Sequence, residues 1–257
     1  MKRLKLLIIV VVVVVLILVL NNQRRHVDHF QNVSIPLSPR LSNDDIIHLK
    51  LGQKKMSNML KEFDRICQKY NIKYFLIAGS LIGATVHKGF IPWDGDVDLE
   101  VCEKDYPKLR AVLPIELPKN MWLQDKKSDK KYNHRILSKI RDLTSCYTDY
   151  PYVGKTSHQG LQIDINIYKE NDGKIYFPDD PNVTYLTKND VYPLKRVPFE
   201  NFKVFIMNNP NKYLDNKYGK RWRKLLPVNE RYPHEGRVDP YKTCHFHYNM
   251  YPNLYKH

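Results

Sequence analysis

Two aspartates, Asp96 and Asp98, alternate with apolar residues along the segment 96–101, and this pattern constrains the fold more than any other feature. Successive side chains of a β-strand point to opposite faces, so both carboxylates lie on one face and Val97 on the other. Carboxylates this close repel each other unless a cation neutralises them. Because oxygen-only ligands suit Mg²⁺ or Mn²⁺, we expect a strand that carries a metal site.

Two further aspartates extend this candidate site. Asp94 is either another metal ligand or a loop-capping residue, and Gly95 lets the backbone turn tightly beside it. Asp164 lies between isoleucines in a second strand pattern, where a charge is costly unless it is paired or bound to metal. An acidic turn or a calcium loop is the alternative for residues 94–98. An EF-hand does not fit, because its twelfth-position glutamate and flanking helices are absent.

An uninterrupted apolar run, Leu6–Leu20, indicates a transmembrane signal anchor near the shorter end of what spans a bilayer. Basic residues precede it, which places residues 1–5 in the cytosol and the rest of the chain in the lumen. A cleaved signal peptide is the alternative, but no small-x-small cleavage site follows the run. We therefore expect a single-pass type II protein of the Golgi or endoplasmic reticulum, with a polar stem over residues 21–43.

The sequons at Asn32 and Asn182 agree with a lumenal location and are candidate glycosylation sites. The chain also has four well-separated cysteines, which allow one or two disulfides in an oxidising compartment. The sequence does not give their connectivity.

The sequence predicts one α+β catalytic domain over residues 44–257, with a mixed sheet flanked by helices. The patterns predict helices over 44–70, 79–86 and 105–113, and a last helix that starts at Asn209-Pro210 and stops at Gly219. Strands are expected over 73–78, 97–102, 135–140, 161–168, 175–177 and 202–207.

The chain carries a formal net charge of +15, which favours anionic partners such as phospholipid surfaces, nucleotides or nucleic acid. Neither a zinc-finger framework, nor a sustained basic helix, nor an aromatic RNA-binding signature accompanies that charge. We therefore expect no nucleic-acid partner and favour nucleotide-linked or phosphorylated substrates.

One ordered stretch resembles a known family. It runs Tyr-Phe-Leu-Ile-Ala-Gly-Ser-Leu-Ile-Gly-Ala over residues 74–84 and His-Lys-Gly-Phe-Ile-Pro-Trp-Asp-Gly-Asp-Val-Asp over residues 87–98. This is similar to the signature of the LicD family, which includes bacterial phosphorylcholine transferases, fukutin and fukutin-related protein. Weaker similarity continues through Lys139-Ile140-Arg141 and Asp164 and ends at Tyr218-Gly219-Lys220-Arg221-Trp222.

The resemblance implies a nucleotidyltransferase fold of the DNA polymerase β type, with Asp96, Asp98 and Asp164 holding Mg²⁺ or Mn²⁺. Gly79 and Ser80 would lie at a strand-to-helix turn and hold a phosphate, for which the alternative is an ordinary helix cap. Further candidates for binding phosphate are Lys88, Lys139 and Arg141, and each of them could instead be a surface charge.

The function that follows is transfer of a phospho-alcohol group, such as phosphocholine or ribitol phosphate, from a CDP-linked donor to a glycan hydroxyl in the secretory lumen. In that reaction Asp164 is the candidate base or base-positioning ligand. The alternatives are a nucleotidyltransferase that uses a nucleoside triphosphate and a non-catalytic lumenal binding protein. Two departures from the family pattern stand out: Gly95 replaces a frequent acidic residue, and the cysteines do not match the zinc-binding insertion of fukutin-related protein.

Overall fold

The computed structural model describes residues 35–148 and 158–245. Its longest described helix is α2 (Asn43–Lys69), which Ser42 caps. The Ser42 hydroxyl accepts the backbone N–H of Asp45 at 3.1 Å, and the Asp45 carboxylate accepts the backbone N–H of Ser42 at 2.9 Å. This capping box confirms the predicted start, and the helix continues unbroken past Gly52.

A mixed seven-stranded sheet forms the centre of the domain, with β1, β2, β6, β4 and β3 side by side in that order. Strands β2 and β6 run parallel, whereas β1 pairs with β2, β4 with β6, and β3 with β4 in antiparallel fashion. The strands of this path are β1 (Tyr74–Leu76), β2 (Val97–Cys102), β3 (Met121–Gln124), β4 (Ser138–Asp142) and β6 (Gln162–Asn171). Strand β7 (Lys174–Tyr176) extends the end of β6, and β8 (Leu186–Thr187) pairs with β7.

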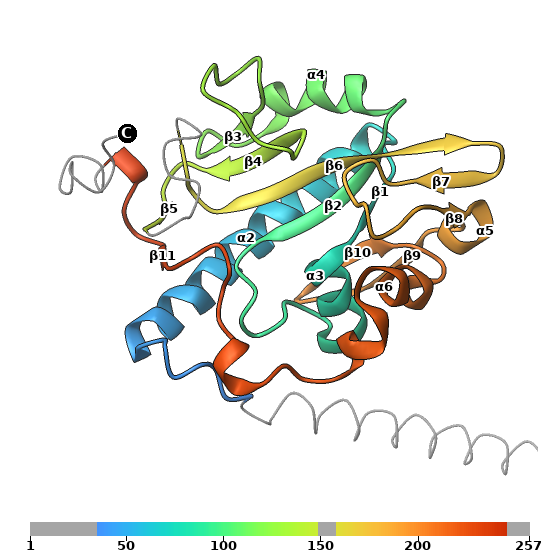
Figure 1. Cartoon of the computed structure of the whole chain (residues 1–257). Helices are drawn as coiled ribbons and strands as arrows, with labels where there is room; N and C mark the ends of the chain where they lie inside the picture. Colours follow the sequence, from blue (N-terminus) through green and yellow to red (C-terminus); the bar gives the residue numbers. More distant parts are fainter. Residues whose placement is uncertain (1–34, 149–157, 246–257) are drawn as a thin grey trace, which may run out of the picture. The chain divides into compact units, whose positions relative to one another are not determined.

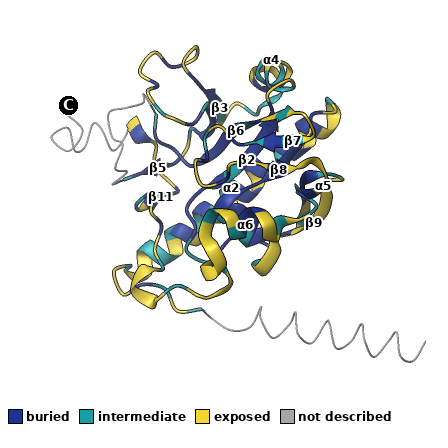
Figure 2. Cartoon of the chain, turned by 45° about the vertical axis from the view of Figure 1, so that its right-hand side comes forward, coloured by how far each residue is buried: buried dark blue, intermediate teal, exposed yellow. Residues whose placement is uncertain are grey.

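Helix α2 crosses behind β2 and β6, while α3 (Ala78–Ile82) and α6 (Pro210–Tyr218) lie together on another side of these strands (Figure 1). The apolar residues of β2 and β6, such as Leu99 and Ile163, are fully buried in one core with Leu60 of α2. Figure 2 shows this dark central layer under exposed outer helices. Burial of the apolar strand faces therefore turns the alternating aspartates to the other face of the sheet.

The remaining elements surround this layer. Helix α3 continues into the π-helical turn η1 (Gly83–His87), and α4 (Tyr106–Glu116) contacts β3. Helix α6 ends at Tyr218, just before Gly219, as predicted. A separate hairpin pairs β9 (Lys195–Phe199) with β10 (Phe202–Ile206). The short elements are α5 (Lys188–Val191), η2 (Gly219–Arg223) and η3 (Val228–Glu230).

The C-terminal segment, residues 228–245, returns to the sheet and passes close to the start of β2 (Figure 1). Its strand β11 (Val238–Asp239) pairs with β5 (Cys146–Tyr147), and a disulfide joins Cys146 to Cys244. Cys67 and Cys102 are free and buried. The structure thus supplies the pairing that cysteine spacing left open.

The prediction of a transmembrane helix as part of the fold is corrected. No helix within residues 35–148 and 158–245 is long and apolar enough to cross a membrane. The segment Leu6–Leu20 and the sequon at Asn32 lie outside the described residues. The fold that the structure describes is the mixed α+β domain alone.

Candidate active site

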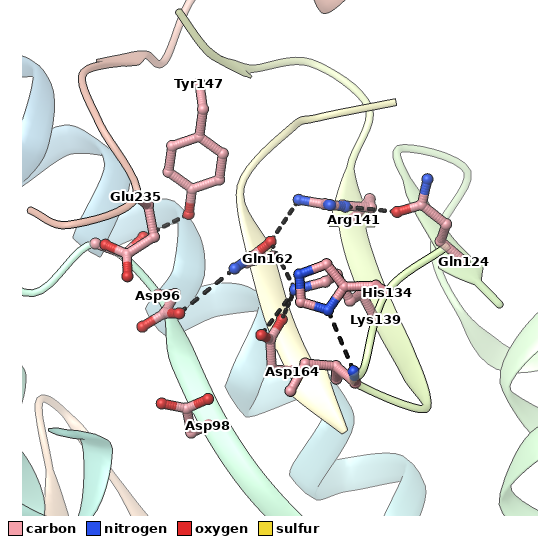
Figure 3. Close-up of polar contacts among 12 residues, drawn as sticks. Asp96, Asp98, Gln124, His134, Lys139, Arg141, Tyr147, Gln162, Asp164 and Glu235 are labelled. Carbon is pink, nitrogen blue, oxygen red and sulfur yellow. Dashed lines mark hydrogen bonds and ion pairs between the residues drawn. The ribbon is translucent and has the colours of Figure 1, made fainter. Parts of the chain in front are cut away.

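Three predicted carboxylates meet on neighbouring strands. Asp98 of β2 is the register partner of Asp164 of β6, and Asp96 lies just before β2. Each of the three offers an oxygen atom, and these atoms all lie within 4.8 Å of one another. Figure 3 shows the three side chains at the same face of the two strands. Residues distant in sequence therefore form one acidic cluster, as the strand patterns predicted.

Like Asp164, Asp96 is buried, with 5% of its surface exposed. Its Oδ2 accepts a long hydrogen bond from Gln162 at 3.4 Å, whereas its buried Oδ1 has no hydrogen-bond partner. Burial, together with the nearby charges of Glu235 and Asp98, raises the pKa of Asp96 well above its ordinary value. An unpaired buried carboxylate oxygen is costly, which makes this position favourable for a cation.

The backbone of Asp98 is held from both sides. Its N–H donates to the hydroxyl of Ser80 at 2.9 Å, and its carbonyl accepts the N–H of Ile77 at 3.1 Å. Burial and the charge of Asp164 raise the pKa of the Asp98 carboxyl to about 7. Ser80, predicted to bind phosphate, thus contacts the backbone of a candidate metal ligand directly.

Asp164 is paired with Lys139, its register partner on β4. The ammonium group donates to both Asp164 carboxylate oxygens at 2.7 Å and to Gln162 at 3.1 Å. Lys139 is fully buried, and this burial lowers its pKa while the charge of Asp164 acts against the change. The lysine therefore orients Asp164 from within the protein, and any contact with phosphate remains a prediction.

Arg141 is also fully buried. Its guanidinium donates to Gln124 at 2.7 Å, to Gln162 at 2.6 Å and to the carbonyl of Gly160 at 2.9 Å. Figure 3 shows the resulting chain of contacts from Gln124 through Arg141 and Gln162 to Asp96. In this arrangement the arginine acts on the site by positioning Gln162.

Asp94 completes the loop before β2 and is 7% exposed. A Cβ atom at Gly79 would lie 2.8 Å from its Oδ2, so the glycine permits this close approach. Gln53 of α2 donates to the backbone carbonyl of Asp94 at 3.0 Å and fixes the loop. Burial and the charge of Glu235 raise the pKa of Asp94 well above its ordinary value.

Two other predicted residues lie away from these contacts. Lys88 is exposed at the end of η1, in the left-handed region with a φ of 56°, and its backbone carbonyl accepts the N–H of Glu200 at 2.7 Å. Asn182 is exposed, and its backbone N–H donates to Asp180 at 3.3 Å. Phosphate binding by Lys88 and glycosylation of Asn182 both remain predictions.

Sequence reasoning missed two residues that the C-terminal segment brings to the cluster. Glu235 is 2% exposed, and its neighbour His234 forms an ion pair with it. Together with Asp96 they offer ligand atoms within 4.8 Å of one another. The pairing with Glu235 raises the pKa of His234 to about 9. No periodic pattern marks these two positions, because they lie in an irregular segment.

The arrangement fits a divalent cation. The donor set consists of carboxylate oxygens, and one buried oxygen of Asp96 lacks a hydrogen-bond partner. Asp96, Asp98 and Asp164 are the residues that would hold the ion, and Asp94 lies beside them. Lys139, Ser80 and Gln162 fix the positions of these ligands.

Comparison with known protein families decides what kind of domain carries this cluster. Residues 71–209 match the family model for the LicD/FKTN/FKRP nucleotidyltransferase domain. The chain belongs to the LicD family. The match spans the turn at Gly79, Asp96 and Asp98 at the start of β2, and Asp164 of β6, and it confirms the resemblance seen in the sequence. His234 and Glu235 lie beyond the matched LicD residues.

Among relatives, the chain is 32% identical over 128 residues to the lipopolysaccharide cholinephosphotransferase LicD of Haemophilus influenzae, covering 50% of this chain and 44% of that protein. It is also 27% identical over 194 residues to an uncharacterized protein of Rickettsia typhi, covering 73% of this chain and 54% of that one. The chain thus spans about half the length of these relatives.

A solved structure, ANT(2″)-Ia in complex with adenylyl-2″-tobramycin, aligns with a TM-score of 0.39 and 9% identity over 59% of this chain and 68% of that one.

Proposed function

We propose that this LicD-family chain is a divalent-metal-dependent phosphotransferase that moves a phospho-alcohol group from a CDP-linked donor to a glycan hydroxyl. The observation that carries the proposal is the convergence of Asp96, Asp98 and Asp164, whose oxygens lie within 4.8 Å of one another. Family membership and the cholinephosphotransferase named among the relatives support the reaction class.

The chain's own residues prepare this chemistry before a substrate arrives. Lys139 holds Asp164 through both carboxylate oxygens, and Ser80 holds the backbone of Asp98. Such pre-positioning avoids reorganisation when the donor and the acceptor meet. A bound Mg²⁺ or Mn²⁺ would neutralise charge on the donor phosphates and on the leaving group.

Proton removal from the acceptor hydroxyl is a separate task. Both carboxylate oxygens of Asp164 accept hydrogen bonds from Lys139, which makes Asp164 less suited to accept a proton from the acceptor hydroxyl. Asp98 is half-buried and therefore more open to an incoming group than Asp96. We propose that Asp164 positions the site and that Asp98 is the carboxylate nearest to the entering hydroxyl.

The secretory lumen is the compartment that we propose for this reaction. A disulfide between Cys146 and Cys244 suits an oxidising environment. The sequon at Asn182 is exposed, as an acceptor for N-linked glycan must be. A glycan on a glycoprotein or glycolipid is then the acceptor available to the domain, within the Golgi or the endoplasmic reticulum.

Transfer can be tested directly with purified protein. CDP-choline, CDP-ribitol and CDP-glycerol are each supplied with Mg²⁺ and candidate glycans, and release of CMP together with a modified glycan is the expected result. Asp96→Asn and Asp98→Asn each remove a ligand charge and should abolish transfer. Asp172→Asn is a matched control, because this exposed aspartate lies just beyond the far end of β6.

Unchanged transfer in both Asp96→Asn and Asp98→Asn would refute the metal-site proposal. The domain description also names nucleotidyltransferases, so release of pyrophosphate from a nucleoside triphosphate is the second reaction to assay. If neither donor class reacts, and neither Mg²⁺ with CDP-choline nor a nucleoside triphosphate shifts the melting temperature, the chain is better explained as a non-catalytic binding protein.

A further inference from the structure

Asp96 belongs to two groups of metal-ligating side chains. On one side lie Asp98 and Asp164, and on the other lie His234 and Glu235 of the C-terminal segment. In each group, the candidate ligand atoms are within 4.8 Å of one another. Figure 3 shows Glu235 and Asp164 on different sides of Asp96. The second group therefore adds to the site already described without duplicating it.

Unsatisfied buried atoms lie inside the second group. Glu235 is 2% exposed and Asp96 is 5% exposed, and both Oε2 of Glu235 and Oδ1 of Asp96 lack hydrogen-bond partners. Buried carboxylate oxygens without a donor are costly to fold, so a native protein retains them where a cation or ligand satisfies them. The glycine at position 95 makes room for this carboxylate, because a Cβ atom there would collide with Glu235.

The net negative charge of the carboxylate cluster favours the binding of a second cation. The carboxylates that act on one another here are Asp94, Asp96, Asp98, Asp164 and Glu235. With all five ionised and His234 bound to a metal as a neutral imidazole, the buried ammonium of Lys139 offsets one negative charge and four remain. One divalent ion supplies half of that charge. In this structure the imidazole of His234 forms an ion pair with Glu235. As a neutral imidazole, the same side chain can bind a metal instead.

We propose that Asp96, His234 and Glu235 form a second divalent-cation site, adjacent to the first and bridged to it by Asp96. Its mixed imidazole and carboxylate ligands favour first-row transition ions such as Mn²⁺ over Mg²⁺, which strongly prefers oxygen. The inference shares Asp96 with the metal site of the proposed function and rests on that part of it.

Contacts with strand β5 hold the C-terminal segment beside Asp96. Strand β11 pairs with β5 just after Glu235, and the disulfide between Cys146 and Cys244 closes the segment onto β5. The hydroxyl of Tyr147 on β5 donates to the carbonyl of Gly95 at 2.5 Å, between the two aspartates of the loop. Both halves of the second site are therefore tied to the same short strand.

Mn²⁺ binding to the full chain tests the proposal, since electron paramagnetic resonance counts free and bound ions without any assay of transfer. Two Mn²⁺ ions per wild-type chain are expected, and nitrogen coupling from an imidazole should appear in the pulsed spectrum of one of them. Glu235→Gln and His234→Gln should each bind one ion, and the nitrogen coupling should vanish in His234→Gln. Asp164→Asn should lose the other ion and retain the nitrogen coupling.

Glu230→Gln is the matched control, an exposed glutamate in the same segment that should leave both ions bound. A single bound ion that survives Glu235→Gln but is lost in Asp164→Asn would overturn the second site and leave the first intact. Absence of any bound Mn²⁺ would overturn both. Wild-type protein without nitrogen coupling would also overturn the second site, and that result requires no variant to fold.

Discussion

Asp98 and Asp164 are register partners on β2 and β6, the parallel strand pair within the central sheet. Neighbouring strands lie about 4.8 Å apart, so backbone pairing alone brings two carboxylates to the spacing that one divalent ion can bridge. Lys139 is the register partner of Asp164 on the next strand, β4. Three strands thus present acid, acid and base in one row, and the sheet sets the geometry of the cluster.

Lys139→Met should destabilise the metal-free protein by about 3–5 kcal/mol, because it leaves Asp164 buried and unpaired among other carboxylates. Added Mg²⁺ should restore part of the loss, since the ion replaces the missing positive charge. Urea unfolding in EDTA and in Mg²⁺ measures both effects. Lys169→Met removes an exposed ion pair with Glu103 and should cost less than about 1 kcal/mol. Equal losses in the two variants would contradict the role given to Lys139.

Ser80→Ala should weaken metal binding through the backbone of Asp98. The variant removes the acceptor of the Asp98 N–H and should cost about 1–3 kcal/mol of folding free energy. Calorimetric titration with Mn²⁺ checks the affinity. Ser42→Ala, which removes the cap of α2, should cost about 1 kcal/mol and leave Mn²⁺ affinity unchanged. If both variants bind Mn²⁺ as wild type does, the contact between Ser80 and Asp98 has no part in the site.

Replacing Cys146 and Cys244 together by serine should lower stability by about 3–5 kcal/mol, because the disulfide closes a loop with a sequence separation of 98 residues. It should also weaken Mn²⁺ binding at Glu235 more than at Asp164, since the disulfide holds the C-terminal segment. Thermal unfolding and Mn²⁺ titration, each with and without dithiothreitol, measure these effects. Dithiothreitol should reproduce them in the wild type and change nothing in the double variant.

Ionised Asp190 should stabilise the folded protein at neutral pH, and this stabilisation should be lost in acid. Burial opposes its ionisation, but hydrogen bonds from Lys212 and Thr187 prevail and lower its pKa to about 2. Because this value is below the ordinary 3.8, the stabilisation is complete above pH 3.8 and is lost as pH falls towards 2. Asp190→Asn should therefore cost about 1 kcal/mol at pH 7 by weakening the cap of α5, and much less at pH 2.

Urea unfolding at pH 7 and near pH 2 measures this difference. Asp172→Asn serves again as the control, because Asp172 is exposed at the turn between β6 and β7. A loss of stability in Asp190→Asn that is the same at both pH values would show that its charge does not contribute.

Local patterns were sufficient for much of the fold. The start of α2, the strand Val97–Cys102 and the helix that ends before Gly219 follow from capping chemistry and from the alternation of apolar residues. Local patterns were less informative for strands whose position depends on pairing with a neighbouring strand. Strand β3 was not expected, and β4 lies later than predicted, at Ser138–Asp142. Short strands of this kind exist because a neighbouring strand supplies their hydrogen bonds, which no local pattern records.

The sequence by itself predicted that Asp96 and Asp98 point to the same side, grouped Asp164 with them, and showed the resemblance to the LicD family. Only the tertiary structure decided what completes the cluster. It buried Lys139 against Asp164, paired Cys146 with Cys244, and brought Glu235 from an irregular segment to Asp96. The physical reason is that strand alternation acts between neighbours in the chain, whereas charge compensation acts between neighbours in space.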